Sequence, residues 1–338
     1  MAETVQTPAA RENQEPDRRG LCACESYARA TERAALGGAR WLGRGDQAGA
    51  DEAAASGMHR ELERLPIAGR IVIGPDDCDH LVAGQSVGGG GAAVELALDP
   101  LEGGGVVARG GQGAMSMIAV GEQSSLLALP QMYMRKLSVG PRARGHIDLR
   151  RPMSDNVPAV AEAYGRTAND ITTIVLDRPR HHDLIEELRG AGTRIKLIQD
   201  GTVTATISAA VRGTNDHIAV GIGGTRQAVL AAAALRCLGG ELQAQLWPTT
   251  RREIELAREA GIEDVERVFT TEELVSGEVI VAATGVSNGD LLRGVRFYAD
   301  SARTHSLVMC TRCNWVRFID GTHFFTRDRR QEIRLLGF

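Results

Sequence analysis

The stretch Ala92-Ala-Val-Glu-Leu-Ala-Leu-Asp-Pro-Leu-Glu-Gly103 joins an apolar run to a cluster of polar residues. The run up to Leu98 predicts a buried β-strand, which Asp99-Pro100 ends because proline fixes φ and has no N–H donor. Glu102 follows three residues after Asp99, so one tight turn can direct both carboxylates at the same point. Two such carboxylates suit a hard divalent cation. The alternative is a capped turn with a solvated glutamate.

Outward from this stretch, the chain predicts an α/β fold. On its N-terminal side we expect helices over about 25–41 and 51–65, with Asp51 in the first turn of the second, and strands at 70–73, 92–98, 114–120 and 125–129. On its C-terminal side, strands at 171–176, 194–198, 217–220 and 278–282 alternate with helices at 181–190, 202–212 and 225–237. This alternation predicts a parallel, helix-covered sheet in the C-terminal half.

Composition and charge exclude several classes of protein. The 338 residues are 43% hydrophobic and 24% charged, which is ordinary for a globular chain. Lys and Arg total 39 against 43 Asp and Glu, and this net charge of −4 gives no overall attraction to nucleic acid or to an anionic membrane. No apolar run approaches the roughly 18 residues of a membrane span, and no secretory signal opens the chain. We therefore expect a cytoplasmic protein.

The cysteines and a glycine-rich loop carry weaker signals. Six cysteines are too few for a disulfide scaffold. Cys310-x-x-Cys313 could bind zinc or undergo redox chemistry, but the other close pair, Cys22-x-Cys24, has the wrong spacing for a zinc finger, so two incidental thiols on a strand are favoured. Gly-Ile-Gly-Gly at 221–224 is a poor dinucleotide loop, because Arg226 stands where a third glycine is needed.

Several segments together resemble the class II (GlpX-type) fructose-1,6-bisphosphatase family. Asp-Pro-Leu-Glu-Gly at 99–103 is similar to the turn motif of the lithium-sensitive sugar and inositol phosphatases. The others, in family order, are Ala-Ala-Leu at 34–36, Trp-Leu-Gly-Arg-Gly-Asp at 41–46, Ile-Val-Ile-Gly at 71–74, Met-Tyr-Met-Arg-Lys-Leu at 132–137, Arg-Pro-Arg-His at 178–181, Gly-Ile-Gly-Gly at 221–224 and Ala-Thr-Gly-Val at 283–286. The resemblance extends from about residue 25 to the C-terminus.

The resemblance implies a two-domain sugar-phosphatase fold of helices layered with mixed sheets. We expect a disordered tail over 1–22, then an N-terminal metal-binding domain over 23–150 and a C-terminal sugar-phosphate domain over 151–338. The resemblance also implies Mn²⁺- or Mg²⁺-dependent hydrolysis of the 1-phosphate of fructose 1,6-bisphosphate by a metal-activated water. The partner is then a small-molecule sugar phosphate, with no nucleic acid or membrane, and a homo-oligomer is left open.

Carried over residue by residue, the implied metal site is only partly kept. Asp51, Asp99 and Glu102 match metal ligands, and Asp79 matches the catalytic acid that works with a threonine. Four positions depart from the family pattern: Pro75 and Gln227 replace glutamate ligands, Gly104 replaces the threonine, and Gln47 replaces a lysine. The Gln227 amide can still ligate but adds no charge, so we expect weakened metal binding.

The implied substrate side is better kept. Its matching residues are Tyr133, Lys136, Arg178, Arg180, His181 and Asp200. Arginine suits bidentate phosphate contact, although a solvated basic helix start explains 178–181 as well. Thr202 replaces a sugar-contacting aspartate. Three hypotheses therefore stand: a fructose-bisphosphatase, a weakly active or inactive paralogue that binds sugar phosphates, and a phosphatase for a sugar phosphate of specialised metabolism.

Overall fold

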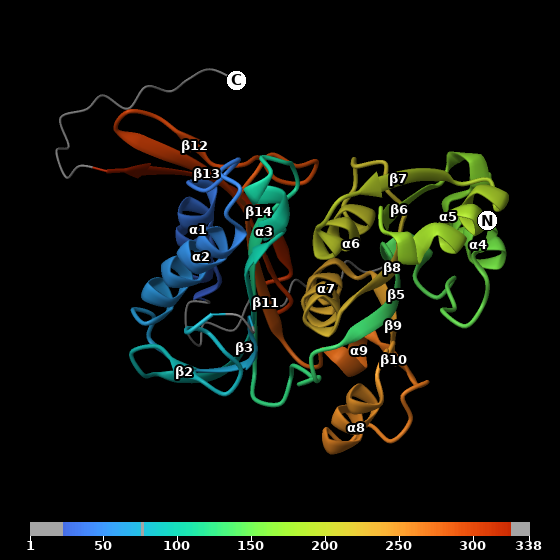
Figure 1. Cartoon of the computed structure of the whole chain (residues 1–338), viewed down its shortest axis with the longest axis horizontal. Coiled ribbons are helices and arrows are strands. Elements are labelled where there is room, and N and C mark those ends of the chain that lie inside the picture. Colours follow the sequence, from blue (N-terminus) through green and yellow to red (C-terminus); the bar gives the residue numbers. More distant parts are fainter. Residues whose placement is uncertain (1–22, 76–77, 326–338) are drawn as a thin grey trace, which may run out of the picture.

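The structure, a computed structural model, describes residues 23–75 and 78–325. The expected disordered tail, 1–22, lies outside the described residues. Within them the strands form two mixed sheets, one of eight strands and one of six, which stand side by side in Figure 1. The fold is therefore α/β, as expected.

The eight-stranded sheet has the order β12-β13-β11-β4-β3-β1-β2, with β14 paired to β13. Every residue of β4 is buried, because the strand lies between β3 and β11 and has helices on both faces. The strands are β1 (Ile67–Ile73), β2 (Ser86–Val87), β3 (Ala92–Glu102), β4 (Met115–Gly121), β11 (Val279–Gly285), β12 (Arg296–Phe297), β13 (Ser301–Cys310) and β14 (Trp315–Phe324).

The six-stranded sheet has the order β10-β9-β5-β8-β6-β7. Its strands are β5 (Tyr133–Val139), β6 (Thr172–Leu176), β7 (Arg194–Ile198), β8 (Ile218–Gly224), β9 (Glu241–Leu246) and β10 (Val268–Thr270). The expectation of a parallel sheet is wrong for half of it: β6 pairs in parallel with β7 and β8, but β5 runs antiparallel to β8 and β9. The alternating pattern missed β5, β9 and β10.

The sheets do not divide at residue 150. β5 precedes that position but belongs to the six-stranded sheet, whereas β11 to β14 follow it and belong to the eight-stranded sheet. The apolar residues of β11 explain its return, since Ile280 to Ala283 pair with β4 on one side and β13 on the other. The chain thus leaves the eight-stranded sheet after β4 and comes back to it with β11.

Helices cover the sheets in layers (Figure 1). The helices are α1 (Ser26–Ala39), α2 (Gln47–Leu62), α3 (Gly104–Ala108), α4 (Met153–Tyr164), α5 (His182–Gly190), α6 (Thr202–Ala210), α7 (Thr225–Leu238), α8 (Arg251–Glu259) and α9 (Thr271–Leu274). The pair α1/α2 packs on the outer face of the eight-stranded sheet, α6 and α7 lie between the sheets, and α4/α5 cover the outer face of the other. In the described part of the chain, no helix combines the length and apolar character of a membrane span.

Close packing of α1 on α2 depends on two glycines. A Cβ on Gly37 would lie 2.3 Å from the Ala53 carbonyl oxygen, and one on Gly57 would lie 2.5 Å from that of Arg33. Neither backbone can move away cheaply, so larger residues would separate the helices. This contact fixes α2, the helix that carries Asp51.

Three local expectations change. The second helix begins at Gln47 rather than 51, because the Asp46 side chain accepts a hydrogen bond from the Gly49 N–H at 2.8 Å and caps it there. Residues 125–129 form no strand beyond a single bridge between Leu126 and Val275. The expected turn after Leu98 is a β-bulge within β3, which suits Pro100 because a bulge does not need its missing N–H.

Candidate active site

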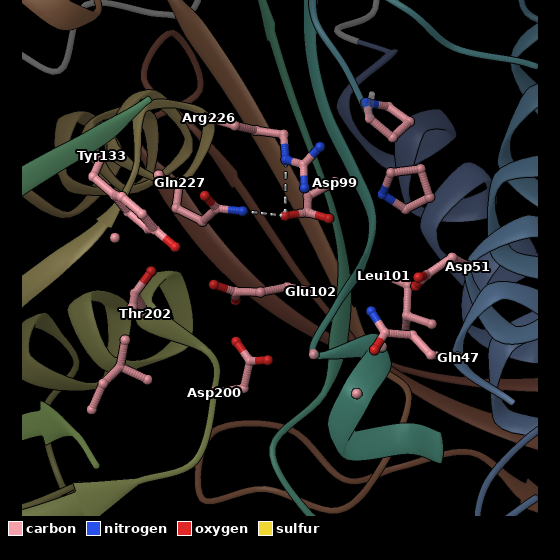
Figure 2. A pocket seen from close by; sticks show the side chains of 18 of the residues that line it. Gln47, Asp51, Asp99, Leu101, Glu102, Tyr133, Asp200, Thr202, Arg226 and Gln227 are labelled. Carbon is pink, nitrogen blue, oxygen red and sulfur yellow. Dashed lines mark hydrogen bonds and ion pairs between the residues drawn. The ribbon is translucent and has the colours of Figure 1, made fainter. Parts of the chain in front are cut away.

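A cavity of about 450 Å³ lies where the end of β3 and the start of α2 face the ends of β6 and β8. Its lining includes most of the expected site residues, namely Gln47, Asp51, Pro75, Asp99, Glu102, Gly104, Tyr133, Arg178, Arg180, Asp200 and Gln227. Figure 2 shows Glu102, Asp200 and Thr202 around its middle, with Asp51 and Gln47 at the side formed by α2. Residues far apart in the sequence thus meet in one cavity.

Asp99 is already engaged by protein groups. Its Oδ2 accepts a hydrogen bond from Gln227 Nε2 at 2.9 Å and lies 3.4 Å from Arg226 Nε (Figure 2). Arg226 also donates from Nη1 to the Gly74 carbonyl at 3.2 Å. Because Asp99 is buried, this ion pair gives its charge a partner inside the protein.

Glu102 is the other carboxylate of the bulge and is also buried. Its Oε1 accepts a hydrogen bond from the Val203 N–H at 2.9 Å, at the start of α6. Burial, followed by the neighbouring charges of Asp99 and Asp200, raises the pKa of Glu102 to about 8. The carboxyl group is therefore largely protonated at neutral pH unless a further cation stabilises its charge.

Asp51 enters the cavity from the second turn of α2, not the first. A Cβ on Gly104 would lie 2.2 Å from Asp51 Oδ1, so the carboxylate occupies the space beside this glycine. Gln47 lies one turn earlier, and a Cβ on Gly105 would be 3.2 Å from its Oε1. Polar side chains of α2 therefore lie against the two glycines that begin the short helix α3.

The loop after β1 holds the least complete part of the expected site. Pro75 lines the cavity but offers no ligand. Asp79 is exposed and is not part of the lining, so the structure does not bring it together with Asp51, Asp99 and Glu102. Asp76 and Asp77, the other acidic residues of this loop, lie outside the described residues.

The opposite wall is basic. Arg178 donates to the carbonyl oxygens of Asp177 and Gln199, and Arg180 donates to that of Ile222 at 3.0 Å. The Arg180 guanidinium carbon also lies 5.0 Å from the centre of the Tyr133 ring, a cation–π contact. These contacts use part of the N–H donors of each guanidinium and fix its plane. Both arginines line the cavity.

Lys136 lies behind this wall rather than in the main cavity. It is buried, and its Nζ donates to Thr202 Oγ1 at 3.2 Å, beside a small neighbouring cavity that both residues line. Burial, helped by the charge of Arg180, lowers the pKa of Lys136 to about 8 against the opposing effect of Glu102. Asp200 accepts a hydrogen bond from the Gly201 N–H at 2.9 Å, which orients it at the start of α6.

His181 differs from the expectation of a phosphate contact. It is buried; Nδ1 lies 2.9 Å from the Leu176 carbonyl oxygen, and Nε2 accepts a hydrogen bond from the Ile222 N–H at 2.8 Å. The ring is neutral with its proton on Nδ1, and burial lowers its pKa. Both nitrogens therefore tie β6 to β8, and His181 supports the basic wall from behind.

Two arginines of the lining, Arg226 and Arg109, were not predicted as site residues from the sequence. In the sequence, Arg226 was noted only as an interruption of a glycine pattern. Its position next to Gln227, at the start of α7, was the available signal. With both included, the lining holds four carboxylates and four guanidinium groups: Asp51, Asp99, Glu102 and Asp200, and Arg109, Arg178, Arg180 and Arg226.

The layered sheets form the fold of a sugar phosphatase, and the cavity sets Asp51, Asp99 and Glu102 opposite Arg178 and Arg180. The chain belongs to the family described as bacterial fructose-1,6-bisphosphatase, glpX-encoded, which residues 23–323 match.

Three named relatives are similar in sequence over most of this chain. A protein of Synechococcus sp. (strain JA-3-3Ab) named D-fructose 1,6-bisphosphatase class 2/sedoheptulose 1,7-bisphosphatase is 39% identical, over 90% of this chain and 96% of its own length. Proteins of the same name from Microcystis aeruginosa and Thermosynechococcus vestitus are also 39% identical, over 90% and 88% of this chain and 96% and 94% of their own lengths.

Proposed function

We propose that the protein hydrolyses a sugar bisphosphate, with fructose 1,6-bisphosphate as the default substrate and fructose 6-phosphate and inorganic phosphate as products. One observation carries this proposal: a single cavity sets Asp99 and Glu102 opposite Arg178 and Arg180. Paired carboxylates and a basic wall are the two parts that metal-assisted phosphate-ester hydrolysis needs. The names of the relatives support the same reaction.

The basic wall is the proposed phosphate site. Arg178 and Arg180 are held by carbonyl oxygens and by the Tyr133 ring, so their guanidinium planes are set before a ligand arrives. Fixed guanidinium groups bind phosphate oxygens in pairs at a low cost in side-chain entropy. Tyr133 and Asp200, on the same side, are proposed to contact the sugar, with Lys136 close behind them.

The carboxylates fit a hard divalent cation, proposed as Mn²⁺ or Mg²⁺. The raised pKa of Glu102 supports this: burial is its main cause, and the negative charges of Asp99 and Asp200 beside it raise it further. Asp51, Asp99, Glu102 and the Gln227 amide oxygen are the proposed ligands. A bound cation would neutralise phosphate charge and lower the pKa of the attacking water. Asp79, proposed as the catalytic acid, has the least support because it is exposed outside the cavity lining.

We also propose that metal binding is weakened. Arg226 pairs with Asp99. A metal ion that binds the Asp99 carboxylate must therefore displace the Arg226 guanidinium group or share the carboxylate with it. Pro75 and Gln227 remove two further negative charges at positions where the family resemblance implies ligands. Affinity for hard cations follows the charge of the ligands, so each of these features acts in the same direction.

The Arg226–Asp99 pair favours a second candidate function, a sugar-phosphate-binding paralogue with little hydrolysis. In that case the basic wall binds the ligand while the carboxylate wall stays neutralised by the protein itself. A third candidate is hydrolysis of another sugar phosphate, suggested by Thr202 beside Asp200 in the lining.

The test is phosphate release from a panel of sugar bisphosphates with Mn²⁺ or Mg²⁺, using Glu102→Gln as the inactive control. The proposed function predicts turnover of fructose 1,6-bisphosphate above that of the control. Binding without turnover of any member identifies the second function, and turnover of a different member identifies the third. In cells we propose a cytoplasmic role in carbohydrate metabolism, in the direction of gluconeogenesis.

A further inference from the structure

Three cysteine sulfurs meet on the far side of the eight-stranded sheet. Cys24 lies in the short turn η1 (Ala23–Glu25), Cys310 ends β13, and Cys313 lies in the turn before β14. Their Sγ atoms are all within 4.8 Å of one another, and those of Cys24 and Cys313 are 3.6 Å apart. Cys24 and Cys310 are almost fully buried. The expectation that both thiols lie on a strand is wrong for Cys313, because a turn separates it from Cys310. Cys24 joins the two from the other end of the chain.

The hairpin turn is shaped around the Cys310 sulfur. The Cys313 N–H donates to Cys310 Sγ at 3.4 Å. Burial raises the pKa of the Cys310 thiol, and the Cys313 and Arg312 N–H groups act against that rise. Asn314 follows with a φ of +49°, a left-handed residue that reverses the chain into β14. Backbone N–H groups that point at a sulfur partly neutralise a thiolate, and that is the charge state in which cysteine binds a metal.

The cluster is separate from the cavity. Cys310 pairs with Ile280 of β11, whereas the end of β3 at Glu102 is level with Gly285, through Met115 of β4. Five residues along β11 correspond to roughly 17 Å at a strand rise of about 3.4 Å per residue. No residue of the cluster lines the cavity.

We propose that Cys24, Cys310 and Cys313 bind a zinc ion as thiolates. A tetrahedral zinc with Zn–S bonds of about 2.3 Å separates its sulfur ligands by roughly 3.8 Å. The Cys24–Cys313 sulfur distance of 3.6 Å is close to this value, and the other sulfur distances, at most 4.8 Å, need little adjustment. Soft thiolate ligands select zinc over the hard cations proposed for the cavity. Three thiolates leave one position of a tetrahedral zinc for a further ligand.

Zinc binding requires the reduced protein. Cys24 is disulfide-bonded in this structure. A dithiol or phosphine reductant supplies the two electrons, and two protons complete the two thiols. Zn²⁺ then replaces the proton of each ligating thiol, and these protons pass to solvent. Disulfide formation and zinc binding therefore exclude each other at Cys24.

Bound zinc would fasten the start of α1 to the β13–β14 hairpin. The two sides are 289 positions apart in the sequence, and η1 packs against both β11 and β13. A ligand that binds only the native state raises its stability. Zinc should therefore raise the unfolding temperature of the reduced full-length protein by several degrees.

The experiment is metal analysis of the full chain, purified with a phosphine reductant and dialysed after incubation with zinc. We expect about one tightly held zinc per chain, which Cys310→Ser and Cys313→Ser lose. Each removed thiolate should weaken zinc binding by about 100-fold or more, because even an outer-shell partner contributes 10- to 100-fold. Cys78→Ser is the cysteine control and Glu102→Gln the cavity control, and both should keep the zinc.

A second measurement needs no variant. Zinc should protect Cys24, Cys310 and Cys313 of the wild-type protein from alkylation while Cys78 remains reactive, and Co²⁺ in its place should give thiolate charge-transfer bands. Absence of zinc from the reduced wild type, full retention by Cys310→Ser, or uniform alkylation would overturn the proposal. Iron or copper on the same cysteines would overturn its choice of zinc.

Discussion

The two walls of the cavity differ in how their charged groups are held. On the wall from β3, Asp99 pairs with Arg226 and accepts a hydrogen bond from the Gln227 amide, and Glu102 is buried against α6. On the wall from β6 and β8, Arg178 and Arg180 bond main-chain carbonyl oxygens and stay partly exposed. The carboxylates are thus partnered before a metal arrives, whereas the arginines are oriented and still able to donate.

This difference separates two activities that a phosphatase normally combines. Phosphate can bind the basic wall without breaking any contact, but metal must compete with Arg226 for Asp99. Binding of a sugar phosphate should therefore be robust, and hydrolysis should depend steeply on metal concentration.

The largest expected effect comes from Glu102→Gln. The amide keeps the shape and can still accept the Val203 N–H, but it removes a metal-binding charge. We expect metal-dependent phosphate release to fall by about 100-fold or more, since loss of even an outer-shell partner of a metal costs 10- to 100-fold. The thermal shift produced by fructose 1,6-bisphosphate without metal should remain. Loss of that shift would show that the two walls are not separable.

The converse change is Arg178→Ala or Arg180→Ala. Each removes a charged phosphate donor, which costs about 1.5–3 kcal/mol or roughly 10- to 100-fold in affinity. The measurement is calorimetric titration with fructose 1,6-bisphosphate, without metal. Arg258→Ala, on the exposed surface of α8, is the matched control. Unchanged affinity in both wall variants would contradict a phosphate site here.

Freeing Asp99 should strengthen the metal wall. In Arg226→Ala combined with Gln227→Glu, a positive charge leaves and a negative one enters. We expect metal affinity to rise roughly 10-fold or more, because affinity follows ligand charge. Mn²⁺ titrations of the rate measure it, with Arg226→Lys as a control that keeps the charge. Gly104→Thr, which would restore the threonine of the family motif, is not combined with these changes, because a Cβ there would lie 2.2 Å from Asp51 Oδ1. An unchanged metal requirement would mean that Arg226 does not compete.

The sequence predicts the carboxylate wall well and its partners poorly. Asp99 and Glu102 stand out because a strand and a proline frame them, and 194–198 was predicted as β7 with the observed bounds. Arg226 and the Cys24–Cys313 contact depend on separations of 127 and 289 positions, which no local pattern encodes. The second sheet was expected to be parallel because that prediction was based on β6, β7 and β8, and it did not include the antiparallel strands β5, β9 and β10.

The pH dependence of the free energy of unfolding should also distinguish the two walls, with a smaller expected effect. The folded pKa of Glu102, about 8, lies above its unfolded value of 4.5, so its contribution is present below pH 4.5 and is lost as the pH rises to 8. The folded pKa of Lys136, also about 8, lies below its unfolded value of 10.5, so its contribution returns between pH 8 and 10.5.

Together these groups predict a stability minimum near pH 8 for the metal-free protein. Urea unfolding across this range measures it. In Glu102→Gln the decline from pH 4.5 to 8 should flatten, while the rise above pH 8 stays. Saturating Mn²⁺ should also flatten the decline, since a cation favours the ionised carboxylate. If the stability of Glu102→Gln declines from pH 4.5 to 8 as steeply as that of the wild type, Glu102 is not the group responsible.

The smallest effect concerns the helix that delivers Asp51. Asp46 caps α2 through its bond to the Gly49 N–H, so Asp46→Ala should cost about 1 kcal/mol of unfolding free energy, while Asp46→Asn should cost less because asparagine caps nearly as well. The cap lies more than one turn before Asp51, and the Gly37 and Gly57 contacts hold the body of α2 independently. Phosphate release at saturating metal should therefore change little in either variant. A loss of activity in Asp46→Ala that exceeds the loss of stability would mean that the start of α2 positions Asp51, and that this side of the carboxylate wall is as delicate as Asp99.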